Sequence, residues 1–104
     1  MARYINFSQQ PEPVRLAAHA IGLDHKRPYV RHGKTYYRPY RNRYHTHDKA
    51  HVYNVWQDLC AKGYAVCVEG QAVGNHHYYS FYLTRAGLDW LGETLGIIIY
   101  DEED

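Results

Sequence analysis

The chain has 104 residues and a formal net charge of +1, with 12 lysines and arginines against 11 acidic residues. This length suits one domain with a single modest core, and a content of 15% aromatic and 22% charged residues argues against a disordered chain. No apolar run approaches the roughly 20 residues of a membrane span, and the N-terminus lacks the apolar core of a signal peptide, so we expect a cytoplasmic protein without membrane contact. The two cysteines, Cys60 and Cys67, are too few for a disulfide framework, and we expect buried free thiols.

The first predicted element is a short helix. Pro13 suits a first helical position, and Gly22 suits the end, with Leu23 folding back onto the last turn. Apolar residues recur between them at helical spacing, at Val14, Ala17, Ala18 and Ile21.

A basic, tyrosine-rich stretch follows, from His25 to His47, and contains no acidic residue. It holds seven of the twelve lysines and arginines, which are Lys26, Arg27, Arg31, Lys34, Arg38, Arg41 and Arg43. Five tyrosines lie among them, at positions 29, 36, 37, 40 and 44. Because cations pair with phosphates and flat rings stack on bases, this composition favours a polyanionic ligand.

Within this stretch, Tyr29–Arg31 and Lys34–Tyr37 flank His32-Gly33, which predicts a β-hairpin or an extended arm. Residues Arg38–Tyr44 contain Pro39 and predict a turn or a single helical turn instead of a strand.

The next predicted helix runs from about Asp48 to Lys62, with Asp48 or Thr46 as its N-cap and Gly63 after its end. One continuous apolar stripe supports it, formed by Val52, Val55, Trp56, Leu59 and Cys60.

Two strands are then predicted, Tyr64–Glu69 and His77–Leu83, with a loop at Gly70–Asn75. Alternation in the second strand places Tyr79, Phe81 and Leu83 on one face and Tyr78, Ser80 and Tyr82 on the other.

Thr84 is the predicted N-cap of a last helix that Gly96 ends, with Leu88, Leu91 and Leu95 along one side. Ile97–Tyr100 fits a short strand or a segment docked on the core. The acidic residues Asp101–Asp104 fit a solvated end, an aid to solubility, or a mimic of the polyanion. The predicted fold class is therefore α+β.

The second half resembles winged-helix DNA-binding proteins of the MarR and PadR kind. A helix ending near Lys62 is followed by a hairpin and then by Leu83, Thr84, Gly87 and Leu91, which is similar to the start of the helix after the wing in those families. The resemblance covers roughly residues 48 to 96 and implies one compact winged-helix-like domain with three helices and an antiparallel hairpin wing.

The first half departs from that pattern. In a regulator, a second amphipathic helix precedes the recognition helix, whereas the basic stretch occupies that place here. The first half resembles small phage and prophage proteins, through Gly22-Leu23 and Arg41–Tyr44.

Nucleic acid is the expected partner, with DNA favoured by the resemblance. The residues predicted to contact phosphates are Arg31, Lys34, Arg38, Arg41 and Arg43, with Tyr36, Tyr37 or Tyr40 as stacking or positioning groups. In the predicted recognition helix, Lys49, His51, Asn54 and Gln57 are candidates to face a groove. The alternative is a protein-interaction module that binds a protein partner through its tyrosine-rich surface, and a homodimer is compatible with either.

Three histidines, His45, His47 and His51, fall within seven residues. His47 and His51 would lie one helical turn apart if the helix began near Thr46. Asp48 or His76-His77 could complete a metal shell, but the spacing matches no structural zinc motif, so we expect exposed histidines and no cofactor. The sequence has no phosphate-binding loop, dinucleotide turn or nucleophile elbow, which predicts a non-enzymatic protein.

Overall fold

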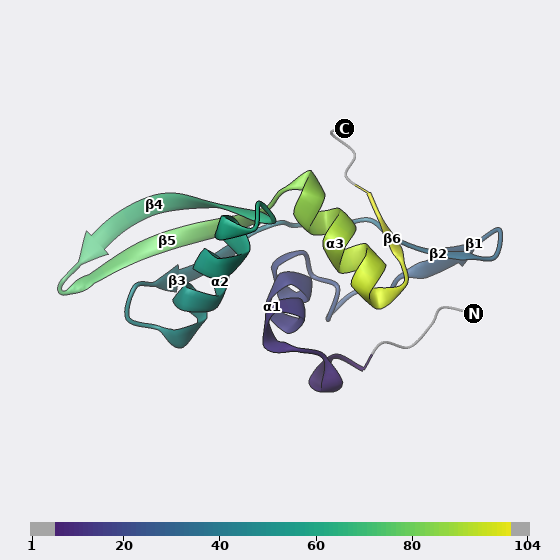
Figure 1. Cartoon of the computed structure of the whole chain (residues 1–104), viewed down its shortest axis with the longest axis horizontal. Helices are drawn as coiled ribbons and strands as arrows, with labels where there is room; N and C mark the ends of the chain where they lie inside the picture. Colours follow the sequence, from purple (N-terminus) through teal and green to yellow (C-terminus); the bar gives the residue numbers. More distant parts are fainter. Residues whose placement is uncertain (1–5, 101–104) are drawn as a thin grey trace.

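The computed structural model describes residues 6–100 and confirms an α+β fold with three α-helices (Figure 1). In chain order the elements are a 3-10 helix η1 (Phe7–Gln9), α1 (Glu12–Ala20), β1 (Tyr29–Arg31), β2 (Lys34–Tyr37), β3 (Tyr44–His47), α2 (His51–Ala61), β4 (Ala65–Val73), β5 (His76–Leu83), α3 (Arg85–Leu95) and β6 (Ile98–Ile99).

The strands form two separate three-stranded sheets. One has the order β1–β2–β6, with β6 parallel to β2, and the other is antiparallel with the order β3–β5–β4. We call β1–β2 the short hairpin and β4–β5 the long hairpin. The two hairpins lie at opposite ends of an elongated molecule of 51 × 30 × 22 Å, with the three α-helices between them (Figure 1).

The first helix ends as the sequence predicts. Gly22 has a φ of +78°, the Leu23 N–H donates to the Ala18 carbonyl at 2.9 Å, and the Gly22 N–H donates to the His19 carbonyl at 3.1 Å. These two bonds form a Schellman motif. The predicted hairpin at His32-Gly33 is also confirmed, because both residues have positive φ and join β1 to β2 in a two-residue turn.

The core lies between the helices and one face of the β3–β5–β4 sheet. The Trp56 ring of α2 stacks on Phe81 of β5, with centroids 5.4 Å apart, and Tyr53 lies 5.1 Å from Tyr79. Trp56 and Phe81 are completely buried. The predicted alternation in β5 is therefore confirmed, with the Tyr79, Phe81 and Leu83 face against the core, and we call this side of the sheet its inner face.

The predicted start of α2 is wrong. The helix begins at His51, its N-cap is Ala50, and neither Asp48 nor Thr46 caps it. Thr46 is instead a buried residue of β3 that pairs with Tyr79. The Asp48 carboxylate accepts a hydrogen bond from the His77 N–H at 3.3 Å. Pairing with a distant strand therefore replaces the local cap. The predicted end of α2 is confirmed, since Gly63 has a φ of +80° and the Tyr64 N–H donates to the Leu59 carbonyl.

Three smaller expectations are also corrected. Residues Arg38–Arg43 contain no helical turn, and Tyr44 begins β3, a strand that the sequence did not predict. The predicted loop Gly70–Asn75 is mostly strand, because β4 continues to Val73 through an irregularity between Glu69 and Ala72. Cys67 is exposed in β4 and Cys60 is half-buried, whereas both were expected to be buried.

The last helix follows its predicted signals. The Thr84 hydroxyl accepts a hydrogen bond from the Gly87 N–H at 3.1 Å, and Gly96 ends the helix with a φ of +73°. Gly87 is required because a Cβ there would overlap the Tyr64 carbonyl oxygen. Residues 97–100 bring Ile97 and Ile99 into the core, and β6 completes the short-hairpin sheet.

Within residues 6–100 no helix is long and apolar enough to cross a membrane. The acidic run Asp101–Asp104 lies outside the described residues.

Candidate nucleic-acid interface

The β3–β5–β4 sheet has a second face that none of the described helices covers, which we call the outer face. Cross-strand pairs define it, since His45 is opposite Ser80 and His47 is opposite Tyr78, and directly opposed residues point to the same side. Val66 and Val68 of β4 continue the same rows, opposite Tyr82 and Ser80. The outer face comprises Arg43, His45, His47, Val66, Val68, Tyr78, Ser80 and Tyr82.

Side-chain contacts order this face into rows across the sheet. The Arg43 guanidinium lies 5.7 Å from the centroid of the Tyr82 ring, and His45 Nδ1 lies 2.8 Å from the Ser80 hydroxyl oxygen. The His47 and Tyr78 rings meet edge to face with centroids 5.8 Å apart. The outer face therefore holds flat rings and a cation in fixed positions, and none of its eight side chains is a carboxylate.

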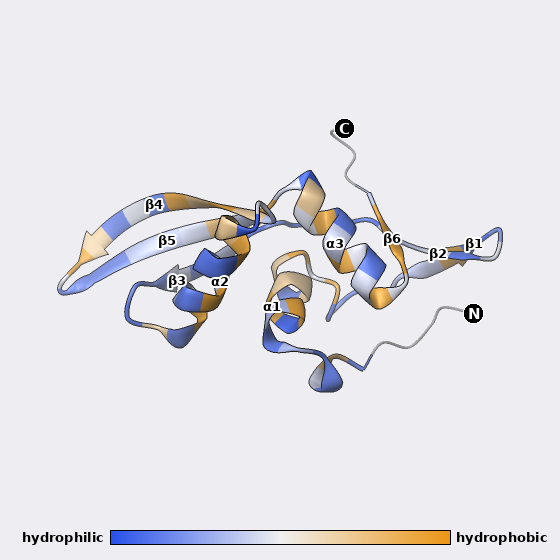
Figure 2. Ribbon diagram, in the orientation of Figure 1, coloured by the Kyte–Doolittle hydropathy of each residue, from blue (hydrophilic) through white to orange (hydrophobic). Residues whose placement is uncertain are grey.

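The apolar part of the outer face is exposed. Val66 is 49% exposed, Val68 is 50% exposed and Tyr78 is 39% exposed. Figure 2 shows hydrophobic residues at both ends of β4, while β5 is mostly hydrophilic. Since isolated exposed valines are common but a row of them beside aromatic rings is not, this face has the composition of a contact surface.

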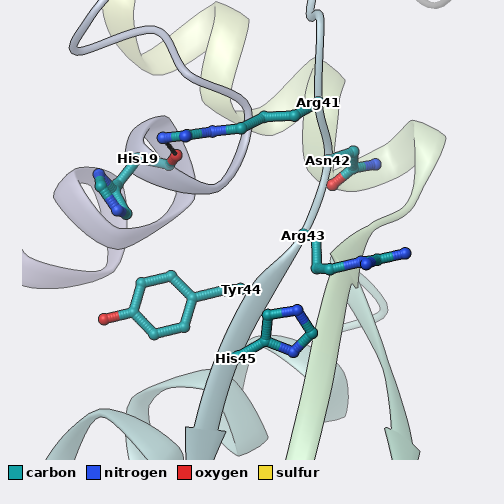
Figure 3. A pocket seen from close by; sticks show the side chains of 6 residues that line it. All are labelled: His19, Arg41, Asn42, Arg43, Tyr44 and His45. Atoms are coloured by element: carbon teal, nitrogen blue, oxygen red, sulfur yellow. Dashed lines mark hydrogen bonds between the residues drawn. The ribbon is translucent and has the colours of Figure 1, made fainter.

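An open hollow of about 610 Å³ separates the outer face from α1 (Figure 3). Its lining residues are His19, Arg41, Asn42, Arg43, Tyr44 and His45. Figure 3 shows Arg41 and Tyr44 pointing toward α1, while Arg43 points to the other side of the same segment.

Arg41, one of the predicted contact residues, and its neighbour Asn42 have structural roles near the hollow. The Arg41 guanidinium donates to the His19 carbonyl at 2.7 Å, at the C-terminal end of α1, where a cation interacts favourably with the helix dipole. The Asn42 side chain binds the backbone of Leu83 through both its amide nitrogen and its oxygen. The Arg43 N–H donates to the Ala20 carbonyl at 3.0 Å, while the Arg43 side chain points away from α1 (Figure 3).

The predicted cations of the basic stretch do not form one patch. Arg31 and Lys34 are exposed on the short hairpin, at the opposite end of the molecule from the tip of the long hairpin (Figure 1). Neither they nor Arg43 form an ion pair with a carboxylate of residues 6–100. No carboxylate of residues 6–100 therefore neutralises these cations. They belong to two separate surfaces, the short hairpin for Arg31 and Lys34 and the outer face for Arg43.

Two of the three tyrosines predicted as stacking or positioning groups, Tyr36 and Tyr37, already contact other residues of the chain. Tyr36 stacks on Tyr29 at 5.9 Å and meets Tyr100 edge to face at 6.4 Å. Tyr37 is only 1% exposed, and its hydroxyl donates to the Ile21 carbonyl at 2.9 Å. Burial raises the pKa of Tyr37 to about 12, so it stays neutral in the core. The expectation that Tyr37 could stack on a ligand is therefore wrong.

Arg38 and Tyr40 are exposed in the segment that joins the two sheets. The Tyr40 ring lies over Gly22 and 5.5 Å from the Arg41 guanidinium carbon, with 54% of the residue exposed. These two residues lie nearer to Arg43 along the chain than Arg31 and Lys34 do.

The polar residues of α2 face away from the outer face, because α2 packs against the inner face of the sheet through Trp56. Asn54 is exposed on α2 and Lys49 is exposed just before the helix begins, whereas Gln57 reaches across to Cys67 of β4, with 3.9 Å between its amide nitrogen and the sulfur. The His51 ring nitrogen lies 2.7 Å from a Glu12 carboxylate oxygen. Asn54 and Arg43 therefore cannot contact the same short segment of nucleic acid.

The structure does not bring together His45, His47 and His51, the three histidines that were considered as metal ligands and not favoured. His45 contacts Ser80 and His51 contacts Glu12, while His47 lies beside His76, with ring centroids 4.6 Å apart. Among residues 6–100, two other groups are close enough to share an ion: His47 with Asp48 and His76, and His19 with Asp24 and His25.

Sequence reasoning missed the outer face as a site. Its signal was present, since the alternation of the predicted strand His77–Leu83 placed Tyr78, Ser80 and Tyr82 together. What the sequence did not contain was the pairing of β5 with β3, which adds Arg43, His45 and His47 to that side.

Comparison with known protein families, with curated proteins and with solved structures gives no match. The winged-helix resemblance therefore stays a prediction. Within residues 6–100 the order α2, β4, β5, α3 is the order that it implies, but β3 occupies the place of the helix expected before α2.

Proposed function

We propose that this chain is a non-enzymatic nucleic-acid-binding protein that holds a single-stranded segment on its outer face. The observation that carries the proposal is the continuous row of Arg43, Tyr82, His45, His47 and Tyr78, which are exposed or half-buried on a sheet face that no helix of residues 6–100 covers. Unpaired bases can stack on such rings, whereas the bases of a duplex are already stacked on one another.

Charge supports the same ligand. The outer face carries a guanidinium and no carboxylate, and Arg43 is exposed without an ion-pair partner among residues 6–100. An arginine beside a tyrosine ring can contact a phosphate while the ring contacts the neighbouring base. Arg38 and Tyr40, which precede Arg43, could extend the path of the strand.

Binding through α2 has weaker support. A recognition helix that enters a major groove is normally set against a preceding helix, and no helix lies between α1 and α2 in the structure of residues 6–100. The exposed side of α2 also carries Asp58, and Glu12 already engages His51. We therefore assign the interface to the sheet.

The test is a fluorescence-anisotropy titration of labelled single-stranded and duplex oligonucleotides, both DNA and RNA, over a range of salt concentrations. Tyr82→Ala should weaken single-strand binding by about 1–3 kcal/mol, the usual value of one stacked base. Arg43→Ala should weaken binding and lower the slope of log K against log salt by about 0.7, the value for one phosphate contact on a single strand.

Arg31→Ala is the matched control, because it removes an exposed arginine from the opposite end of the molecule. It should leave single-strand affinity unchanged. Equal losses for Arg31→Ala and Arg43→Ala, or tighter binding of duplex than of single strands, would rule out the outer face as the interface.

A protein partner is the second candidate, favoured by one observation. Val66, Val68 and Val73 are exposed on β4, which is an edge strand of its sheet. An apolar edge strand can bind another strand through its backbone. This alternative predicts complexes whose affinity hardly depends on salt, or self-association that rises with protein concentration in sedimentation velocity runs without nucleic acid.

A further inference from the structure

Two histidines and an aspartate meet at the end of the outer face nearest the tip of the long hairpin. Ligand atoms of His47, Asp48 and His76 all lie within 4.8 Å of one another, and the two imidazole rings are 4.6 Å apart at an interplanar angle of 64°. The three residues are half-buried, in contrast to the exposed trio of His19, Asp24 and His25. We propose that His47, Asp48 and His76 bind a divalent transition-metal ion of the zinc class.

The hydrogen bonds of the two histidines support this inference. Nδ1 of His76 is enclosed and has no hydrogen-bond partner among residues 6–100, although an enclosed polar atom normally has one. Nδ1 of His47 accepts a hydrogen bond from the Lys49 N–H at 3.2 Å, which identifies it as a nitrogen with a lone pair. A metal ion would satisfy the first atom and replace a long hydrogen bond at the second.

The fold holds the aspartate in place independently of any ion. The Asp48 N–H donates to the His77 carbonyl at 3.0 Å, and one carboxylate oxygen of Asp48 accepts from the His77 N–H at 3.3 Å. The other carboxylate oxygen of Asp48 lies 3.7 Å from Nδ1 of His77 and does not take part in this backbone bond, so it is the oxygen that a metal would use.

The ligand chemistry selects the class of ion. Two imidazoles and one carboxylate suit zinc or a similar first-row ion, whereas calcium and magnesium prefer oxygen ligands. Three protein ligands leave at least one coordination position for water or for an external oxygen atom. The site adjoins Tyr78 through His47, so a phosphate on the outer face could supply that atom, but metal binding does not depend on nucleic-acid binding.

The test is isothermal titration calorimetry, with Zn²⁺ titrated into the full chain. The protein is purified without a polyhistidine tag and freed of bound metal with a chelator. One ion should bind per chain, and thermal unfolding should move to higher temperature when zinc is added. Co²⁺ bound at the same site should show the visible absorption bands that are typical of cobalt with few ligands. His76→Gln and Asp48→Asn should each weaken zinc binding at least about tenfold.

Asp48→Asn is the informative variant for folding, because an asparagine oxygen can still accept the His77 N–H bond while the charge is lost. His25→Gln is the matched control, since it alters the other histidine–aspartate group and should leave zinc affinity unchanged. Circular dichroism of the metal-free variants establishes that they are folded. The proposal fails if zinc does not bind at sub-millimolar concentration, if His76→Gln binds zinc like the unmodified protein, or if His25→Gln causes the same loss.

Discussion

The side chain of Asn42 binds the backbone of Leu83 as a neighbouring strand would. Its amide nitrogen donates to the Leu83 carbonyl at 2.9 Å, and its oxygen accepts from the Leu83 N–H at 2.8 Å. Leu83 is the last residue of β5 and is followed by Thr84, the N-cap of α3. Asn42 therefore joins the segment before β3 to the point where β5 ends and α3 begins.

We predict that Asn42→Ala lowers the free energy of unfolding by about 2–3 kcal/mol, because it leaves two half-buried backbone groups without partners. Urea unfolding followed by tryptophan fluorescence measures this loss. Asn42→Asp keeps the acceptor but loses the donor, so its free energy of unfolding should lie between those of Asn42→Ala and the unmodified protein. A loss below that of a surface substitution such as Asn54→Ala would show that Asn42 is not an anchor.

A second link of this kind joins Tyr37 to Ile21. The Tyr37 hydroxyl donates to the Ile21 carbonyl at 2.9 Å in a site that is 1% exposed, and burial raises its pKa to about 12 from 10.0. The unfolded chain therefore loses this proton at lower pH than the folded protein does. The resulting stabilisation is complete below pH 10 and disappears as the pH rises through 12.

This difference predicts a loss of about 2–3 kcal/mol of stability between pH 10 and pH 12 from Tyr37 alone, at 1.36 kcal/mol per pKa unit. Urea midpoints across this pH range measure it. Because burial also raises the pKa of Tyr44, the effect of Tyr37 is isolated by comparison with Tyr37→Phe. This variant should lose about 1 kcal/mol of unfolding free energy at neutral pH. Its unfolding free energy should then fall less steeply between pH 10 and pH 12 than that of the unmodified protein. Parallel pH curves for the two proteins would contradict the assignment.

Local chemistry explains what the sequence could predict. The ends of α1, α2 and α3 were predictable because Gly22, Gly63 and Gly96 act on neighbouring residues through positive φ angles. β3 was not, because Tyr44–His47 pairs with residues of β5 more than thirty positions away. The same pairing withdraws Asp48 from the start of α2, and it alone brings His47 near His76. Candidate site residues were therefore predicted by composition, while their grouping depended on long-range register.

The contact between Gly22 and Tyr40 gives a third prediction about stability. A Cβ at Gly22 would overlap the Tyr40 ring, and its φ of +78° is also unfavourable for alanine. Gly33 has a φ of +77° but nothing within 4 Å of such a Cβ, so Gly33→Ala isolates the backbone cost of about 1–2 kcal/mol. Gly22→Ala should cost more than Gly33→Ala, as measured by urea unfolding.

Tyr40→Ala should restore part of the stability of Gly22→Ala, because it removes the overlapping ring. Tyr40→Ala by itself should lower the free energy of unfolding only slightly, since Tyr40 is 54% exposed. The double-mutant cycle gives the interaction energy directly. If the two losses simply add, the ring does not limit position 22.

Val68 provides a gain-of-function test of the proposed interface. It is 50% exposed at the centre of the outer face, opposite Ser80. Val68→Lys adds a cation there, so it should tighten single-strand binding several-fold at low salt and steepen the salt dependence by about 0.7. Val30→Lys is the matched control, because Val30 is 39% exposed in a strand of the short hairpin. Anisotropy titrations should show no gain in single-strand affinity for this control. Equal gains in affinity for the two variants would indicate attraction by net charge without a defined face. Loss of binding to a protein partner in Val68→Lys alone would favour the alternative function.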